Sequence, residues 1–510
     1  MLLFHFDFNF LNPRVDYLHA WIDRLADLGY TGIVWELEDK VQWQTCPECV
    51  WPEAMSREEL QGLLAHARER GMTNIPLLQT IGHAEYVLKH EPYIGWRENP
   101  ERHDCYCTSR PEVRAFLARW IAEYLEIFGE IEHFHLGGDE AYQFASCEVC
   151  KAAAEATSRN ALYAEHIREL AAPIQARGIK PGIWCDMVLH HPEQMDAIPA
   201  DIVIWDWNYW DGTAPRKRGM VWGQGFRQVE DVSAETRAAY PDMITADGLY
   251  KPFYTSDFLR DQGREVIVCS ATRSSGDSLH CGRQDEHSPN VAVAAQKAVR
   301  SGLAGTLVTS WAIRLSSFET QYPWIVLAAL AYRQPEADYD DLLAQVAADV
   351  FGLPDASVFT MMRQVGTPVP FARRHESGIQ FNGLKDPVLP PDGYIETWLT
   401  DERRESMVAD MTAAMTAIAE GTLMLADLRT AATRGEDILD AWATAADRQA
   451  GSLMLAISAL GPADDLARGS ARWLLLRERA AVAQAYAGWQ TPESAVHTAT
   501  LAYSALTGWL

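Results

Sequence analysis

The stretch HFHLGGDEAYQF, residues 133–144, places two carboxylates side by side, Asp139 and Glu140. They follow an alternating apolar run and two glycines, a pattern typical of a buried strand that ends in a sharp turn. Neighbouring acids repel each other and resist burial, so water or a ligand must compensate their charge. If both enter one cleft, their surroundings can separate their pKa values and give a proton donor beside an anion. The alternative is a solvated turn on the surface.

Carboxylates, histidines, a glutamine and aromatic rings stand at the ends of several other strand-like runs. Indole rings offer stacking surfaces for the apolar faces of a sugar, and carboxylates accept hydrogen bonds from its hydroxyls. Any one of the Trp residues could instead belong to the core, and the acids could form buried ion pairs or helix caps. The residues concerned are Glu36, Glu38, Asp39, Gln79, His83, His90, Trp184, Asp186, Trp205, Asp206, Trp207, Tyr209, Trp210 and Trp311.

Two C-x-x-C units, CPEC and CEVC, have the spacing of tetrahedral zinc ligands. They follow the second and the fourth strand-like run, so both loops should emerge at the same face of a barrel. The sequence therefore predicts a structural Zn²⁺ that ties these loops together. Reduced thiols or a redox-labile pair are the alternatives. The predicted ligands are Cys46, Cys49, Cys147 and Cys150, with Cys105 and Cys107 of the third loop as competing thiols.

Eight short strand-like runs must position these side chains. They alternate with amphipathic stretches such as residues 14–29 and 57–71, which end in Gly as a helix C-cap would. This alternation predicts a (β/α)8 TIM barrel over residues 1–335, with an open doubly wound sheet as the alternative. We favour the barrel because polar and aromatic residues gather at nearly every C-terminal strand end. The runs are residues 2–8, 32–38, 73–79, 132–138, 180–186, 201–207, 265–271 and 305–311.

After residue 335 the sequence becomes rich in Ala and Leu with helical spacing. This pattern predicts an α-helical C-terminal domain over residues 336–510. The domain is also a candidate homodimer surface.

The composition argues against some classes of partner. The chain has 510 residues, of which 48% are hydrophobic and 22% charged, as is ordinary for a globular protein. A net charge of −26 and a pI of about 5.0 argue against nucleic acid or an anionic membrane. The N-terminal MLLFHFDFNF lacks the basic region and cleavage site of a signal peptide, and no apolar run is long enough to span a bilayer. Together with nine cysteines, an odd number, these features predict a cytoplasmic protein.

The motif HLGGDE resembles the H-x-G-G-D-E signature of glycoside hydrolase family 20, the β-N-acetylhexosaminidases. The stretches ELED, PLLQTIGHAEYVLKH, GGDEAY, WCDM and IWDW are similar to the motifs at the corresponding positions of the hexosaminidase D-like branch. The resemblance implies the family barrel, a helical C-terminal region and an exo-acting glycosidase. Its substrates would be small glycans or glycoconjugates with a terminal β-linked N-acetylgalactosamine or N-acetylglucosamine, and the branch favours the former.

The resemblance also implies a retaining, substrate-assisted mechanism that needs no cofactor, an exception to the usual two-carboxylate scheme. The 2-acetamido oxygen of the substrate attacks its own anomeric carbon and gives an oxazolinium intermediate. Glu140 would protonate the leaving oxygen and then activate water, while Asp139 would orient the acetamido group. Three Trp residues would wall the acetamido pocket, and His83 would lie near the carboxylates. The implied and candidate substrate-binding residues are Arg14, Glu38, Asp39, His83, Trp184, Asp186, Trp205, Tyr209 and Trp311.

Three positions depart from the family pattern. The first strand end, DFNFLNPR, lacks the usual Arg, and Arg14 is the candidate substitute. The seventh strand lacks the Tyr that bonds the acetamido oxygen, for which Tyr209 is the candidate. Ile313 stands where many members have a Glu. These positions help to distinguish gluco from galacto sugars, so the sugar preference stays open.

Two other functions fit parts of the sequence. A non-catalytic amino-sugar-binding barrel would explain the altered sugar-recognition positions, whereas the intact pair of acids favours an enzyme. A metal-dependent barrel hydrolase would need a ligand cluster, but the first strand contains no H-x-H motif. Its candidate ligands are His83, His90, Asp186, His190 and His191.

Overall fold

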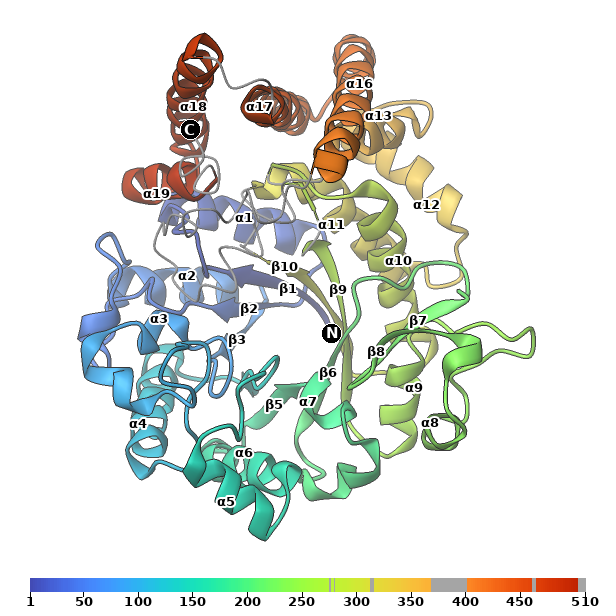
Figure 1. The fold of residues 1–510 in the computed structure, drawn as a ribbon. Coiled ribbons are helices and arrows are strands. Elements are labelled where there is room, and N and C mark those ends of the chain that lie inside the picture. The colour runs from blue at the N-terminus through green and yellow to red at the C-terminus, as the bar shows by residue number, and fades with distance from the viewer. Residues whose placement is uncertain (275–276, 279, 312–315, 368–400, 461–464, 503–510) are drawn as a thin grey trace.

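Eight parallel strands close into a barrel in this computed structural model, which describes residues 1–510 except 275–276, 279, 312–315, 368–400, 461–464 and 503–510. The strands are β1 (Leu2–Asp7), β2 (Gly32–Glu36), β3 (Thr73–Leu77), β4 (His133–His135), β5 (Lys180–Trp184), β6 (Val203–Trp207), β9 (Val266–Arg273) and β10 (Gly305–Ser310). Their order is β1-β10-β9-β6-β5-β4-β3-β2 (Figure 1). The predicted TIM barrel is confirmed, and the open sheet is excluded because β1 pairs with both β2 and β10.

The barrel strands are buried on both faces, as expected of a parallel sheet covered by helices. Every residue of β1, β2 and β10 is buried. Alternate residues such as Leu3, Val34 and Leu307 form a cluster inside the barrel. The residues between them, such as Phe4 and Ile33, join the larger core that includes the helices. The strands therefore read as nearly continuous apolar runs, which made them predictable.

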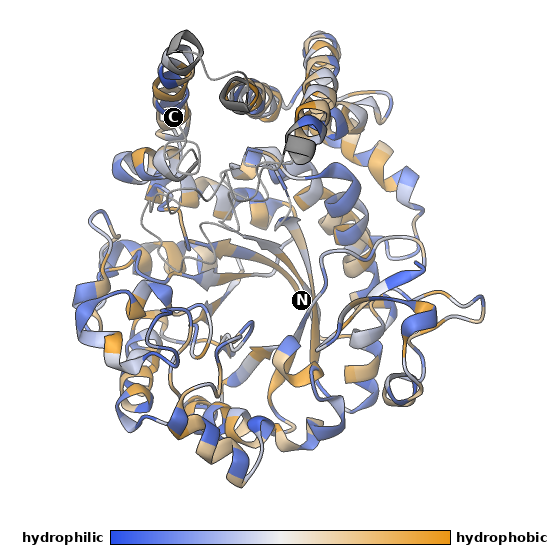
Figure 2. Cartoon of the chain, viewed as in Figure 1, coloured by the Kyte–Doolittle hydropathy of each residue, from blue (hydrophilic) through white to orange (hydrophobic). Residues whose placement is uncertain are grey.

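Helices surround the barrel, and hydrophobic and hydrophilic residues alternate around them (Figure 2). In the helix α2 (Arg57–Glu69), Ser56 and Glu59 form a capping box, while Leu60 and Leu64 on one face are buried. Up to β10 the helices are α1 (Val15–Asp27), η1 (Pro47–Cys49), α2 (Arg57–Glu69), α3 (Glu85–Leu88), η2 (Glu91–Trp96), α4 (Pro111–Phe128), α5 (Glu148–Ala156), α6 (Arg159–Gln175), α7 (Asp186–Leu189), η3 (Pro192–Ala197), η4 (Val229–Asp231), α8 (Ala234–Ala239), α9 (Tyr254–Asp261) and α10 (Gln284–Arg300).

An antiparallel hairpin, β7 (Arg218–Val221) and β8 (Gly225–Gln228), lies outside the barrel after β6. No prediction covered it. Its strands are short and β8 is wholly exposed, so they lack the alternation that marks a half-buried strand.

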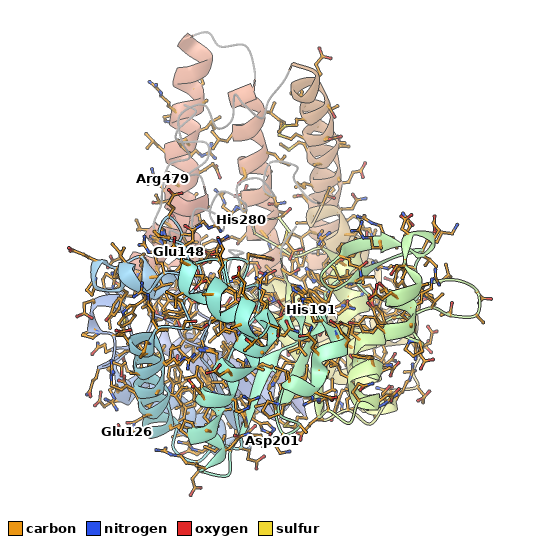
Figure 3. All side chains as sticks on the ribbon, turned by 60° about the horizontal axis from the view of Figure 1, so that its bottom comes forward. Glu126, Glu148, His191, Asp201, His280 and Arg479 are labelled. Carbon is orange, nitrogen blue, oxygen red and sulfur yellow. A yellow bond between two sulfur atoms is a disulfide. The ribbon has the colours of Figure 1, made fainter. Side chains whose placement is uncertain are left out.

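Helices dominate the described chain after β10, which confirms the predicted helical C-terminal region; its boundary at residue 335 stays a prediction. They are α11 (Phe318–Arg333), α12 (Tyr339–Val346), η5 (Ala347–Phe351), α13 (Ser357–Val365), α16 (Asp401–Ala431), α17 (Glu436–Leu460), α18 (Asp465–Tyr486) and α19 (Pro492–Ala502). The long helices α16, α17 and α18 extend away from the barrel (Figure 3). Within the described ranges, no helix is both long and apolar enough to cross a membrane.

The first barrel loop and the C-terminal helices share backbone hydrogen bonds. The N–H of Arg14 donates to the carbonyl of Trp489 at 2.8 Å, and the N–H of Thr491 donates to the carbonyl of Asn12 at 2.9 Å. The N–H of Asn12 donates to Ser494 Oγ at 2.9 Å. The segment that follows β1 is thus held by the connection between α18 and α19.

Candidate active site

The loop after β4 carries the paired carboxylates through a tight turn. Gly137 and Gly138 have φ angles of 63° and 89°, and Glu140 itself has a φ of 42°. A Cβ atom at Gly137 would lie 2.1 Å from Gln79 Oε1, so only glycine fits beside the neighbouring strand end. Left-handed backbone at a residue such as Glu140 is strained, and such strain clusters at functional sites.

His83, in the loop after β3, contacts both carboxylates. Its Nε2 lies 3.3 Å from Asp139 Oδ2 and 3.5 Å from Glu140 Oε2. Gly82 lets the two loops approach, because a Cβ there would lie 2.3 Å from the carbonyl oxygen of Asp139. His83 also has a positive φ, 51°. The structure therefore brings together three residues that were predicted from separate motifs.

Burial and mutual charge set the protonation of this group. Burial opposes protonation of His83, but the carboxylates of Asp139 and Glu140 outweigh it and raise the His83 pKa well above its usual value. Burial raises the pKa of Asp139 despite the neighbouring His83. Burial acts on Glu140 in the same direction, but the hydrogen bond and charge of His83 prevail and lower the Glu140 pKa. Burial and His83 thus shift the pKa values of the two neighbouring acids in opposite directions.

Asp186, at the start of α7, supports the turn that carries Glu140. Its Oδ2 accepts the backbone N–H of Glu140 at 2.8 Å, and its Oδ1 accepts the indole N–H of Trp207 at 3.3 Å. Burial and the charge of Asp139 raise the pKa of Asp186 to about 8. At neutral pH this carboxyl is therefore mostly protonated. It positions the Glu140 backbone, and its predicted contact with substrate stays a prediction.

Tyr142 was not among the predicted site residues, and Trp207 was named only as a strand-end aromatic residue with no role assigned. The Tyr142 hydroxyl donates to Glu140 Oε1 at 2.7 Å, and its side chain is 61% exposed. A weak signal existed for each, because Tyr142 belongs to GGDEAY and Trp207 ends a barrel strand.

Trp184 and Trp205, predicted to wall a sugar pocket, are fully buried inside the barrel. The ring centroid of His135 lies 4.4 Å from that of Trp184 and 4.9 Å from that of Trp205. This placement agrees with the core alternative, because inward strand residues fill a TIM barrel in layers. Both indole N–H groups, however, lack an acceptor among the residues that the structure describes, which is uncommon for buried donors. Their role as pocket walls stays a prediction.

Tyr209 and Trp311 lie just beyond β6 and β10 and are partly exposed, with ring centroids 6.2 Å apart. The Tyr209 hydroxyl oxygen is buried and forms no hydrogen bond of normal geometry in the described part of the chain, although Thr309 and Trp311 lie close enough to lower its pKa. Asp139 Oδ1 is also buried and unpaired there. Burial, with the charge of Asp139 as a smaller cause, raises the pKa of Tyr209 well above its usual value. A buried hydroxyl donor and a buried carboxylate acceptor are the two groups that the C=O and N–H of an amide require.

Arg14 and Asp39 are engaged elsewhere. Arg14 donates to the carboxylate of Asp16 at 2.9 and 2.6 Å, because it immediately precedes α1 and Asp16 lies in the first turn. The predicted role of Arg14 as substitute for the missing family Arg, which grips sugar hydroxyls, stays a prediction. Asp39 is buried and forms ion pairs with Lys40 and Lys89. These contacts agree with the alternative given for Asp39 in the sequence analysis, a buried ion pair in place of contact with a sugar hydroxyl.

Glu36 is a buried carboxylate that was named only as a strand-end acid with no role assigned. Its Oε2 lies 3.0 Å from His5 Nε2, and its Oε1 accepts from Gln79 Nε2 at 2.9 Å. Its charge contributes to the raised pKa of Asp139. Strand alternation could have singled it out, because Val34, two residues earlier, points into the barrel. Glu38 is buried with a φ of 44°, and its predicted contact with a sugar hydroxyl stays a prediction.

The structure contradicts the predicted four-cysteine zinc site. Cys46 and Cys49 form a disulfide with each other, because their spacing lets both thiols meet within one short turn. Neither thiol is then available to a metal. A different group of ligand atoms lies within 4.8 Å of one another, from Glu98, Cys107, Cys147 and Cys150.

This four-residue group is the only cluster of potential metal ligands in the described ranges. The histidines proposed for a metal-dependent hydrolase do not form one there. His191, for example, is half-exposed and contacts Glu193. The geometry therefore does not favour the metal-dependent hydrolase.

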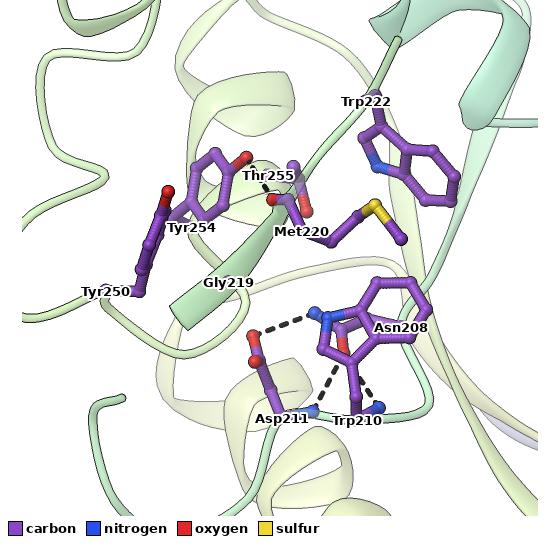
Figure 4. A pocket seen from close by; sticks show the side chains of 9 residues that line it. All are labelled: Asn208, Trp210, Asp211, Gly219, Met220, Trp222, Tyr250, Tyr254 and Thr255. Atoms are coloured by element: carbon purple, nitrogen blue, oxygen red, sulfur yellow. Dashed lines mark hydrogen bonds between the residues drawn. The ribbon is translucent and has the colours of Figure 1, made fainter. Parts of the chain in front are cut away.

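A cavity lies between the end of β6 and the β7–β8 hairpin (Figure 4). None of the paired acids or His83 lines it. It neighbours the candidate site through Trp222, whose ring centroid lies 4.5 Å from that of Trp207, the indole bonded to Asp186. The lining residues are Asn208, Trp210, Asp211, Gly219, Met220, Trp222, Tyr250, Tyr254 and Thr255.

Comparison with known proteins gives matches to glycosidases. The model of the glycosyl hydrolase family 20 catalytic domain matches residues 22–312. Hexosaminidase D of Homo sapiens is 30% identical over 220 residues, which cover 41% of this chain and 45% of the human protein. Hexosaminidase D of Bos taurus is 29% identical over 217 residues, 41% of this chain and 63% of the bovine protein. The matched region is thus less than two thirds of either relative.

Among solved structures, a β-N-acetylhexosaminidase from Bacteroides fragilis NCTC 9343 is 16% identical. The match covers 68% of this chain and 69% of that one, with a TM-score of 0.49.

Proposed function

The chain belongs to glycosyl hydrolase family 20, and from this premise we propose that it is an exo-acting, retaining β-N-acetylhexosaminidase. Its substrates are glycans or glycoconjugates with a terminal β-linked N-acetylgalactosamine or N-acetylglucosamine. One observation carries the proposal: adjacent Asp139 and Glu140 meet one histidine and have different pKa shifts. A cytoplasmic location and a homodimer stay predictions.

In the first step of the proposed reaction, the substrate's acetamido oxygen forms a bond to the anomeric carbon. The bond from that carbon to the leaving oxygen breaks, and Glu140 transfers its proton to the leaving oxygen. The product is an oxazolinium, whose positive charge Asp139 stabilises. In the second step, Glu140 takes a proton from water while the water oxygen bonds to the anomeric carbon and the acetamide re-forms. Two inversions give overall retention, and no cofactor takes part.

The productive state has a proton on Glu140 and a negative charge on Asp139. The raised pKa of Asp139 and the lowered pKa of Glu140 both work against this distribution. A bound acetamido N–H that donates to the unpaired Asp139 Oδ1 would stabilise the ionised form of Asp139. Binding of the correct sugar would therefore move the proton distribution toward the reactive one.

Replacing Tyr209 with Phe should lower kcat/KM for N-acetylhexosaminides about 10- to 100-fold, the cost of one hydrogen bond to a charged or developing-charge group. The reason is that the Tyr209 hydroxyl, unpaired in the described chain, is the proposed donor to the acetamido oxygen. Tyr339→Phe is the matched control. Tyr339 lies in the outer helix α12, and its hydroxyl donates to Ser288 Oγ of α10. Initial rates on aryl glycosides measure the effect. Equal rates for both variants would exclude this role of Tyr209.

Replacing His83 with Gln should shift the whole pH profile of kcat/KM upward by about one pH unit. His83 lowers the pKa of both Asp139 and Glu140 through its charge and hydrogen bonds. Loss of the cation therefore raises both values, so the acidic limb (ionisation of Asp139) and the alkaline limb (loss of the Glu140 proton) move in the same direction. Exposed His191→Gln is the control. An unchanged or downward-shifted profile would contradict the assignment.

The function itself is tested with the p-nitrophenyl β-glycosides of N-acetylgalactosamine and N-acetylglucosamine in parallel. Hydrolysis of either, with initial release of the β-anomer seen by NMR, supports the proposal, and the rate ratio defines the sugar preference. Initial release of the α-anomer would contradict retention. Binding of the free sugars without hydrolysis of either glycoside would favour the non-catalytic sugar-binding alternative.

A further inference from the structure

Four potential metal ligands meet in the loops that follow β3 and β4. Glu98 follows η2, and Cys107 precedes α4, both within the long loop after β3. Cys147 is the N-cap of α5, and Cys150 lies in the first turn of that helix. Residues more than 40 positions apart in the sequence thus contribute to one group. The site lies outside the described glycosidase machinery.

The distances within the group fit a tetrahedral metal site. Cys107 Sγ lies 3.6 Å from both Cys147 Sγ and Cys150 Sγ, and Cys150 Sγ lies 3.3 Å from Glu98 Oε2. A tetrahedral Zn²⁺ with bonds of about 2.3 Å to sulfur and about 2.0 Å to oxygen separates its ligands by about 3.8 Å (S to S) and about 3.5 Å (S to O). Disulfide sulfurs lie only about 2.05 Å apart. The spacing therefore corresponds to the edges of a coordination tetrahedron.

Burial strengthens this interpretation. Glu98 and Cys107 are each 1% exposed and Cys150 is fully buried. No Lys, Arg or His forms an ion pair with Glu98 anywhere in the described ranges, although buried carboxylates are normally paired or bound to a metal. A divalent cation would supply the missing positive charge.

Surrounding groups already orient the ligands. The backbone N–H of Cys147 donates to Glu98 Oε1 at 2.9 Å, which leaves Oε2 for a metal. The backbone N–H of Cys150 donates to Cys147 Sγ at 3.3 Å, and Ser109 Oγ lies 3.1 Å from Cys150 Sγ. Such outer contacts fix metal ligands in position.

We propose that Glu98, Cys107, Cys147 and Cys150 bind one structural Zn²⁺. Four protein ligands leave no open position, so the ion would be structural rather than catalytic. It would connect the loop that carries His83 to the loop that carries Asp139 and Glu140. The proposal does not depend on the glycosidase function, because metal content is measured without a substrate.

The test compares Cys147→Ser with Cys105→Ser. Serine is a preferred N-cap, so Cys147→Ser keeps the start of α5 while it removes one thiolate ligand. Cys105 is a buried neighbour whose thiol donates to a backbone carbonyl and lies outside the ligand group, so its variant controls for loss of any thiol. Untagged proteins are expressed with zinc, dialysed, and analysed for metal by mass spectrometry.

Wild type and Cys105→Ser should each retain about one Zn²⁺ per chain. In a competition with a chromophoric chelator, Cys147→Ser should bind Zn²⁺ at least about 100-fold more weakly than wild type. Loss of a group that only contacts a ligand already lowers metal affinity by up to about 100-fold, so loss of a ligand should cost at least as much. Co²⁺ exchanged into the wild type should show thiolate-to-metal absorption that Cys147→Ser weakens. Metal-free, folded wild type after expression with zinc would overturn the proposal. Equal retention in Cys147→Ser, or equal loss in Cys105→Ser, would overturn the assigned ligands. A double Cys46→Ser, Cys49→Ser variant should retain the metal, because those thiols lie outside the group.

Discussion

Glu140→Gln should lower kcat/KM for N-acetylhexosaminides by about 100- to 10,000-fold, the usual range for loss of a general acid or base. Gln has nearly the same shape and keeps an acceptor for Tyr142 but has no proton to give, so the change tests proton transfer directly. The loss should be larger for substrates with a poorly leaving sugar alcohol than for nitrophenyl glycosides, because nitrophenolate leaves with little protonation. Initial rates on both substrate types measure this difference.

Glu126→Gln is the control for Glu140→Gln. Glu126 is an exposed carboxylate on the surface, at the bottom of Figure 3, where it pairs with Arg57. Its variant should have wild-type rates. If Glu140→Gln kept wild-type activity on both substrate types while folded, Glu140 would not be the general acid.

Asp139→Asn should lower kcat/KM by about 100- to 1,000-fold, the size of a lost electrostatic contact to developing charge. A neutral amide at this position cannot stabilise a positive oxazolinium, although it can still approach the acetamido group. The variant should therefore also bind a thiazoline mimic of the intermediate more weakly, by a similar factor. Binding of the free sugar should change much less, because the sugar carries no charge.

The exposed Asp201, which bonds Gln175, provides the matched control Asp201→Asn. It should leave both rate and affinity unchanged. A folded Asp139→Asn protein that lost free-sugar and thiazoline affinity equally would show that Asp139 contributes general binding rather than stabilisation of the intermediate.

The barrel could be predicted because its strands are short, mainly apolar runs that alternate with amphipathic helices. Runs such as residues 2–8 and 32–38 are short and mainly apolar, and amphipathic helices such as the capped α2 separate them. The positions of Asp139 and His83 followed from the same logic, since parallel strands place their C-terminal ends at one face of a barrel. The β7–β8 hairpin was not predicted, because the exposed strand β8 shows no hydrophobic alternation in the sequence.

The remaining site details depend on three-dimensional proximity that local sequence does not encode. Both Arg14 and Asp39 have the right chemistry, but a nearby Asp16 and two lysines engage them. The spacing of the cysteines left two outcomes open, because C-x-x-C spacing suits both a metal and a disulfide, and Cys46 and Cys49 form the disulfide. Cys147 and Cys150 instead meet Cys107 and Glu98 of the third loop, a proximity that local sequence could not show.

The hydrogen bonds between the first barrel loop and the connection of α18 to α19 have a thermodynamic consequence. A cut at the predicted boundary, residue 335, would separate Arg14 N–H from the Trp489 carbonyl and Asn12 from Thr491 and Ser494. Water would replace these partners, so each lost hydrogen bond costs about 0.5–1.5 kcal/mol net, while native stability is only about 5–15 kcal/mol. The helical region thus adds to the free energy of unfolding of the barrel, through contacts between residues near opposite ends of the sequence.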